Sequence, residues 1–293
     1  MLLFKKLTFA LPWLVFFTIA CSYLPSLYQD PYFIISTDFN FYLQLLTLVG
    51  LILLSSFFFV IFVTLASILK IILPACLLAS LIPLLFLNPP SSFLLTGGAF
   101  LSFTAISLLL QKELDQYLTF KATSLLSPSI KQLATILLLV ISVIFYLVAE
   151  KEVSQNGFKI PSSLIEMSLS LTQTSQSLEV SPTTAVNQPQ IPPELLKQYG
   201  VDPAVLEELD KPQNKPQNTM ATLVESQINN LIKPYQQFIP LVLALLLFVT
   251  LKWLASILSI LLTPLLWFIF WILEKTGFTK YEKEMREVKK LII

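Results

Sequence analysis

Side chains that commonly carry catalysis are scarce in this sequence, and histidine is absent altogether. Its absence excludes His-dependent zinc sites, Ser-His proteolysis and general-base catalysis by histidine. Intramembrane aspartyl proteolysis needs two carboxylates at membrane depth, yet no Asp or Glu interrupts the long apolar stretches. The sequence therefore predicts no catalytic, cofactor-binding or metal-binding residues, and a protein that is not an enzyme.

One nucleophile pattern is present, because Ser67 and Lys70 match S-x-x-K, in which a lysine activates a serine for acyl transfer. The other motifs of that enzyme class are missing. Lys70 also lies at the end of an apolar stretch, where a lysine extends toward the lipid headgroups. We interpret it as such a residue. Nucleotide-binding loops, dinucleotide fingerprints and nucleic-acid modules are missing as well, so no nucleic-acid partner is expected.

The two cysteines, Cys21 and Cys76, both lie in apolar stretches and are expected to be buried small hydrophobic side chains. Cys21 also ends a stretch that resembles a signal peptide with a poor lipoprotein box, since Thr18 stands where Leu is usual. We prefer an uncleaved first transmembrane helix. Both interpretations place residue 22 outside the cytoplasm.

Composition indicates a membrane protein. Hydrophobic residues make up 55% of the 293 residues and charged residues 13%, with a mean hydropathy of +0.75. Soluble domains are about 45–50% apolar and about 25% charged. Residues 51–63 are apolar on every face, whereas a barrel strand would alternate, so the apolar runs predict helices that cross a hydrocarbon core of about 30 Å.

The expected fold is an all-α polytopic transmembrane protein with about six crossings. The predicted crossings are residues 7–26, 41–64, 71–87, 93–110, 132–149 and 238–260. They divide the chain into an N-terminal membrane domain (1–149), an extracytoplasmic polar loop with short helices (150–237), C-terminal transmembrane and interfacial helices (238–276) and a cytoplasmic amphipathic tail (277–293).

Positive residues decide the predicted orientation. Lysine or arginine occurs before the first crossing, at Lys70, in 111–131 and in the tail, whereas the short segments 27–40 and 88–92 carry neither. Short cytoplasmic loops are the ones that retain such residues. The sequence therefore predicts an integral plasma membrane protein with both termini in the cytoplasm.

The last apolar run, 238–273, is too long for one straight crossing and contains Lys252. Two crossings would place the positive tail outside, against the charge rule. We expect one crossing, a bend at Pro264 and an interfacial helix over 265–273, whose tryptophans suit the headgroup level. Lys252 would then extend toward the cytoplasmic headgroups or sit at the mouth of a re-entrant hairpin.

The exterior segment is the polar part of the chain. Ser, Thr and Gln dominate 168–190, and Lys-Pro-Gln-Asn occurs twice in 211–218, which is typical of linkers. Short helices are predicted at 193–199 and 204–210.

An apolar stripe at helical spacing follows in 218–233 and needs a partner surface. The short helices, another protein, a second copy of the chain and the outer leaflet are the alternatives. Its residues are Met220, Leu223, Val224, Ile228, Leu231 and Ile232.

The tail is expected to form an amphipathic helix, on the spacing of Tyr281, Met285, Val288 and Ile292. Its basic residues favour anionic lipid by about 1 kcal/mol each at best, reduced by the interleaved glutamates. A coiled coil between two copies is the alternative. A further interfacial helix is expected in 111–131.

The crossings lack candidate catalytic side chains, and a polar exterior segment lies beside them. Together these features favour a membrane scaffold or assembly component that presents this segment to a partner. The alternative is a channel, permease or lipid-handling protein with an uncharged polar path. Such residues are equally typical of hydrogen bonds in helix packing. The candidate path residues are Gln44, Thr47, Ser55, Ser56, Thr64 and Ser80.

Cysteine labelling of intact cells tests the predicted orientation. In a chain whose Cys21 and Cys76 are replaced by alanine, Gly200→Cys should react with an impermeant maleimide added outside. Met285→Cys should react only after permeabilisation, because one crossing separates the two positions. Reaction of both cysteines in intact cells would instead show that 238–273 crosses twice.

Overall fold

The computed structural model describes residues 8–29, 31–35, 39–66, 68–116, 122–156 and 233–278. They belong to two units, one drawn from 1–31, 38–149 and 241–293, the other from 32–37 and 150–240. The predicted short helices and apolar stripe of the exterior segment lie outside the described residues, as does the predicted tail helix.

Every regular element in these ranges is a helix. In chain order they are α2 (Ala10–Gln29), η1 (Pro31–Ile35), α3 (Phe39–Ala66), α4 (Leu69–Ser80), η2 (Ile82–Leu85), α5 (Ser91–Gln116), α6 (Ala122–Asn156), η3 (Lys233–Phe238), α11 (Ile239–Ser259) and α12 (Leu262–Lys275). Helices α2, α3, α5, α6 and α11 are long and apolar enough to cross a membrane. The helical membrane class is thereby confirmed, with five of the predicted crossings each matched by a long helix.

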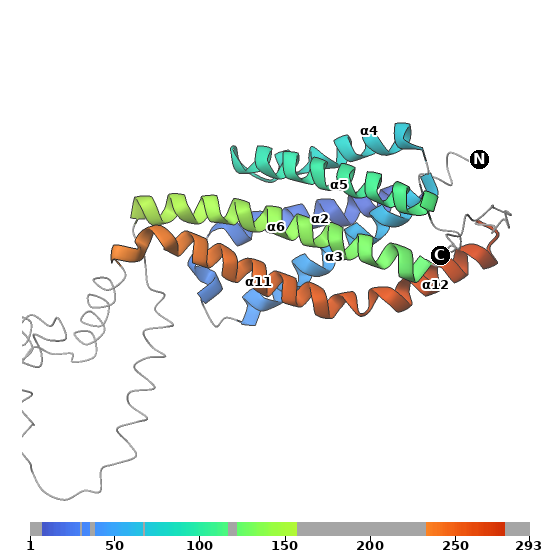
Figure 1. Cartoon of the computed structure of the whole chain (residues 1–293). Helices are drawn as coiled ribbons and strands as arrows, with labels where there is room; N and C mark the ends of the chain where they lie inside the picture. The colour runs from blue at the N-terminus through green and yellow to red at the C-terminus, as the bar shows by residue number, and fades with distance from the viewer. Residues whose placement is uncertain are drawn as a thin grey trace, which may run out of the picture. The chain divides into compact units, whose positions relative to one another are not determined.

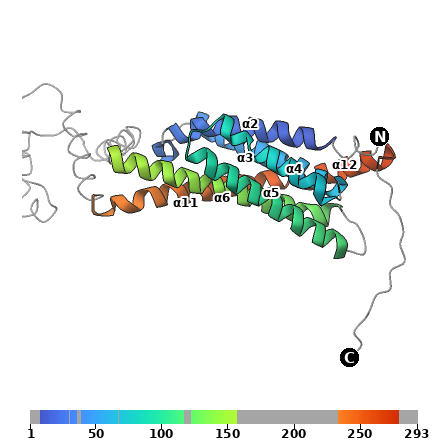
Figure 2. The same cartoon turned by 90° about the horizontal axis from the view of Figure 1, so that it is seen from above.

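The crossing predicted at 71–87 is divided between two shorter elements. Helix α4 ends at Ser80 and the 3₁₀ helix η2 begins at Ile82. Pro83 accounts for the change, because it has no N–H to donate to the carbonyl of Ala79 and its ring crowds that carbonyl. Figures 1 and 2 show α4 lying beside α5.

The bend predicted at Pro264 falls earlier in the chain, at Ile260 and Leu261 between α11 and α12. Pro264 lies in the first turn of α12, where an N–H group would have no acceptor within the helix, so its absence does not destabilise the helix. Its ring instead disturbs the carbonyl four residues before it, that of Ile260. The N–H groups of Ile260 and Leu261 accordingly donate three residues back, to Ile257 (3.2 Å) and Leu258 (3.1 Å).

The region 111–131 does not form the separate interfacial helix that we expected. Residues up to Gln116 continue α5, and residues from Ala122 begin α6. Lysine and glutamate are good helix formers, so charge ends the apolar run without ending the helix. Residues 117–121 lie outside the described part of the chain.

The end of α12 is fixed by a Schellman motif. Gly277 adopts a positive φ of 66°, its N–H donates to Glu274 (3.0 Å), and the N–H of Phe278 donates to Leu273 (2.9 Å). Glycine suits this position because it has no Cβ to clash in the left-handed region. The ring of Phe278 lies 6.3 Å from that of Phe9, which brings the start of α2 and the end of α12 together.

An aromatic cluster holds α2, α3 and α5 together. The indole of Trp13 lies 4.8 Å from the ring of Phe59, 5.8 Å from Phe62 and 5.1 Å from Phe103, measured between centroids. All four side chains are fully buried. Aromatic pairs at these separations stabilise by about 0.5–1.5 kcal/mol beyond the area they bury.

Helices α5 and α6 approach each other closely at Gly98. A Cβ built on this residue would lie 2.5 Å from Cγ1 of Val140 and 3.3 Å from its Cβ, whereas a Cβ on Gly97 meets nothing within 4 Å. Small residues permit such close backbone approach between membrane helices. The two adjacent glycines therefore differ in role.

We expect Gly98→Ala to lower the free energy of unfolding by about 1–3 kcal/mol, because the added methyl overpacks against a stiff valine. Gly97→Ala is the matched control and should change it by no more than about 1 kcal/mol, in the stabilising direction. Thermal unfolding in detergent, followed by helical circular dichroism, measures both. Val140→Ala should rescue Gly98→Ala, and failure of this rescue would contradict the assigned contact.

Candidate functional site: the bundle interior and a surface groove

The interior of the first unit is chemically plain. Within the described ranges, the buried polar side chains are all serines, and no charged side chain is buried. The Ser102 hydroxyl donates to the Gly98 carbonyl (2.5 Å), and the Ser142 hydroxyl donates to the Leu138 carbonyl (2.9 Å). Bonds of this kind satisfy the hydroxyl within its own helix. Ser107 does the same toward the carbonyl of Thr104 (2.8 Å).

The candidate path residues do not converge. Gln44 and Thr47 are exposed on the side of α3, whereas Ser55 and Ser56 of the same helix are fully buried. The remaining two bond within their own helices, Thr64 to the Val60 carbonyl and Ser80 to the Leu77 carbonyl, both at 2.8 Å. The structure therefore does not bring these side chains to one lumen.

Among the residues that the structure describes, three fully buried side chains have polar atoms without a hydrogen-bond partner: Trp13 Nε1, Ser55 Oγ and Ser56 Oγ. Such an atom destabilises a fold by about 1–3 kcal/mol. The apolar remainder of Trp13 outweighs this penalty, since burying an aromatic side chain stabilises more.

The remaining candidates for chemistry stay apart. Cys21 and Cys76 are free and buried, on α2 and α4, which confirms them as buried side chains. Helix α2 continues past Cys21 to Gln29. Lys70 is exposed, and Ser67 lies outside the described residues. Within the same ranges, no three His, Cys, Asp or Glu side chains gather as metal ligands would.

Helices α2 and α6 are joined by a hydrogen bond across their interface. The Tyr28 hydroxyl donates to the Ile141 carbonyl at 3.3 Å. Hydrogen bonds between membrane helices average about 0.6 kcal/mol. This contact contributes more to register than to stability.

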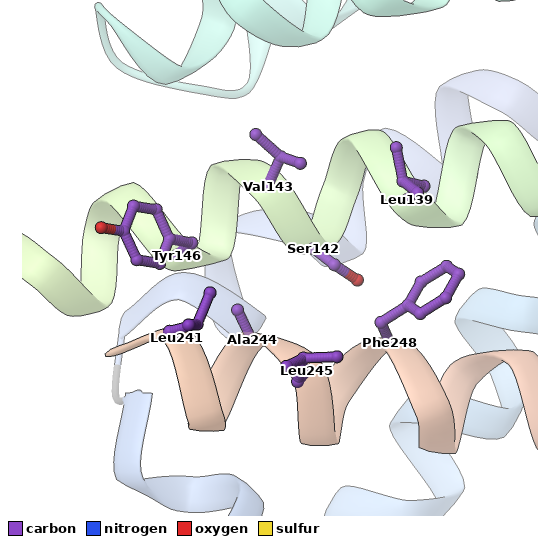
Figure 3. Close-up of a pocket in the computed structure, with 8 residues that line it drawn as sticks. All are labelled: Leu139, Ser142, Val143, Tyr146, Leu241, Ala244, Leu245 and Phe248. Carbon is purple, nitrogen blue, oxygen red and sulfur yellow. The ribbon is translucent and has the colours of Figure 1, made fainter. Parts of the chain in front are cut away.

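A groove of about 310 Å³ lies between α6 and α11 (Figure 3). The two helices run side by side, and the groove is open along its length. Its walls are apolar: the Ser142 hydroxyl is already bonded to its own helix. Leu139, Ser142 and Tyr146 line it from α6, and Leu241, Leu245 and Phe248 line it from α11.

Lys252 follows Phe248 by one turn on α11, and its Nζ lies 5.9 Å from the Phe248 ring centroid. Helix α11 runs unbroken through this residue, so the re-entrant hairpin considered above is not formed there. The lysine side chain is exposed. It therefore extends along the outside of the bundle.

Helix α12 has two different faces. Leu262, Leu266, Phe270 and Leu273 are buried, whereas Trp267 and Trp271 are exposed and lie 6.5 Å apart. Nζ of Lys275 lies 5.0 Å from the Trp271 ring centroid. Exposed tryptophans beside a lysine are typical of a helix at the headgroup level.

Sequence reasoning did not identify the groove. One wall of the groove has a visible sequence pattern, because its α11 residues recur at helical spacing: Leu241, Leu245, Phe248 and Lys252. Nothing in the sequence indicates that α6 is the opposite wall, because a long segment separates the two helices.

Comparisons with protein-family models, with curated proteins and with solved structures gave no match to this sequence.

Replacing the buried tryptophan tests the aromatic cluster. We expect Trp13→Ala to lower the free energy of unfolding by about 3–5 kcal/mol, because it leaves a cavity. Trp13→Phe should be much milder, since it removes the unpaired Nε1 and keeps a ring. Trp253 is 64% exposed and serves as the matched control, so Trp253→Ala should change stability little. Equal losses for Trp13→Ala and Trp253→Ala would contradict the packing.

Proposed function

We propose that this chain is a non-enzymatic membrane scaffold or assembly component that presents its exterior segment, 150–237, to a partner. The plain interior of the described bundle carries the proposal. Ion-coupled transport usually relies on ionisable side chains near the middle of the membrane. The buried polar residues here are serines, and the candidate path residues lie on different faces.

The adjacency of Phe9 and Phe278 supports a topology with both termini on one side. Five crossings alone would leave the ends on opposite sides, so a sixth passage is needed. Helix α4 together with η2, over Leu69–Leu85, is the apolar element available for it. The positive-inside rule then assigns the terminal side to the cytoplasm of a plasma membrane.

The placement of α12 follows from the same topology. After α11 has crossed, the break at Ile260 and Leu261 lets α12 turn along the cytoplasmic surface. Its exposed Trp267 and Trp271 suit the headgroups, and its buried stripe faces the bundle. The basic tail that follows is then placed to bind anionic lipid.

The partner contact is assigned to the apolar stripe of 218–233, whose apolar residues recur at helical spacing. A second copy of the chain and another envelope protein both fit this role. The exposed Glu150 and Lys151 near the end of α6 support an aqueous location for the start of the segment.

Photocrosslinking in intact membranes tests this function. A benzophenone amino acid at Ile228, inside the stripe, should yield a discrete adduct with a second copy or another protein. The same probe at Gln213, in the linker, is the matched control and should yield none, because a linker buries no apolar face.

Two results would contradict the scaffold role. One is a monodisperse monomer without adducts from Ile228 or neighbouring stripe positions. The other is solute or ion flux through vesicles reconstituted with the purified chain, which would favour the channel or permease alternative.

A further inference from the structure

The groove between α6 and α11 leads toward a lysine on each wall. On α11, Leu241, Leu245, Phe248 and Lys252 share one face by their spacing. The ammonium of Lys252 already lies over the ring of Phe248, which lines the groove. One wall therefore ends in a positive charge.

The α6 wall has the same pattern. Tyr146, Leu139, Thr135 and Lys131 follow at helical spacing, and the first two line the groove. The Thr135 hydroxyl donates to the carbonyl of Lys131 at 2.8 Å, and the Lys131 side chain is exposed.

The register of the two helices brings these lysines to the same end. Figure 3 shows Leu139 opposite Phe248, with the helices running in opposite directions. By sequence spacing, Lys252 and Thr135 come about one turn beyond Phe248 and Leu139 on their respective walls. Lys131 follows one turn beyond Thr135, a step of about 6 Å. Two lysine side chains that are offset by one helical turn along the groove can reach a single phosphate.

Neither ammonium forms an ion pair with any residue that the structure describes. A lysine inside a membrane span is costly unless its charge reaches water, headgroups or an anion. Lys252 lies within such a span, Tyr235–Ser259. An anionic headgroup at the end of the groove would satisfy both lysines.

We propose that this groove binds an anionic glycerophospholipid, with the phosphate between Lys131 and Lys252 and one acyl chain along the apolar walls. The helical rise from Lys252 to Leu241 is about 16 Å, close to the roughly 15 Å depth of one leaflet's hydrocarbon. The groove has a volume of about 310 Å³ and apolar walls, which an acyl chain can occupy. Its size and its charged end both fit a lipid.

Native mass spectrometry of the full-length chain tests the site. The chain is released from nanodiscs that contain equal amounts of phosphatidylglycerol and phosphatidylcholine with identical acyl chains. Wild type should retain phosphatidylglycerol preferentially. Lys131→Gln or Lys252→Gln should weaken this preference about 5-fold, and the double variant about 30-fold. Lys131→Arg with Lys252→Arg should retain it.

Matched controls separate the site from general attraction. Lys112→Gln removes an exposed lysine of α5 and should leave the preference unchanged. Leu245→Trp fills the groove and should reduce lipid retention, whereas Leu246→Trp changes a neighbouring exposed residue outside the groove and should not. Circular dichroism of each variant checks that it is folded.

Three results would overturn the proposal: an unchanged preference in the double glutamine variant, an equal loss in Lys112→Gln, or full competition by glycerol phosphate, which has no acyl chain. The site does not depend on the scaffold role. Crosslinking from Ile228 that persists in the double glutamine variant would show that the scaffold role does not depend on the lipid site.

Discussion

Hydrocarbon offers no hydrogen bonds to the backbone, and this constraint shapes the long apolar helices. Backbone groups must find partners within the helix, and the hydroxyls of Ser102 and Ser142 do the same. Little polar attraction is then left to hold the helices together. Side-chain packing holds them together instead, through the close approach at Gly98 and the ring contacts of Trp13.

The charged side chains of the described residues lie on the surface of this bundle. Buried positions in the described ranges carry no charge, while Lys131, Lys252 and Lys275 are exposed. Exposed lysines of this kind are the side chains that can reach lipid headgroups. Proline divides the last apolar run, so α11 and α12 are separate helices despite similar composition.

Apolar run length predicted the five long helices, because bilayer thickness sets it directly. Helix ends were predicted less well: α5 continues to Gln116 through polar residues that favour helix. The break before Pro264 was misplaced because proline acts on the carbonyl four residues earlier. Neither the groove nor the residue that Gly98 packs against was predictable, since both depend on which helices are neighbours, and local sequence patterns do not contain that information.

The short element formed by α4 and η2 has a consequence for the surrounding bilayer. Its helical rise is about 26 Å, below the roughly 30 Å of a typical hydrocarbon core. In the six-crossing topology proposed above, this element is accommodated by local thinning of the lipid beside it. The annulus around the protein is then asymmetric, thin next to α4 and of ordinary thickness next to α11. Such hydrophobic mismatch would give the protein a preference among membranes of different thickness.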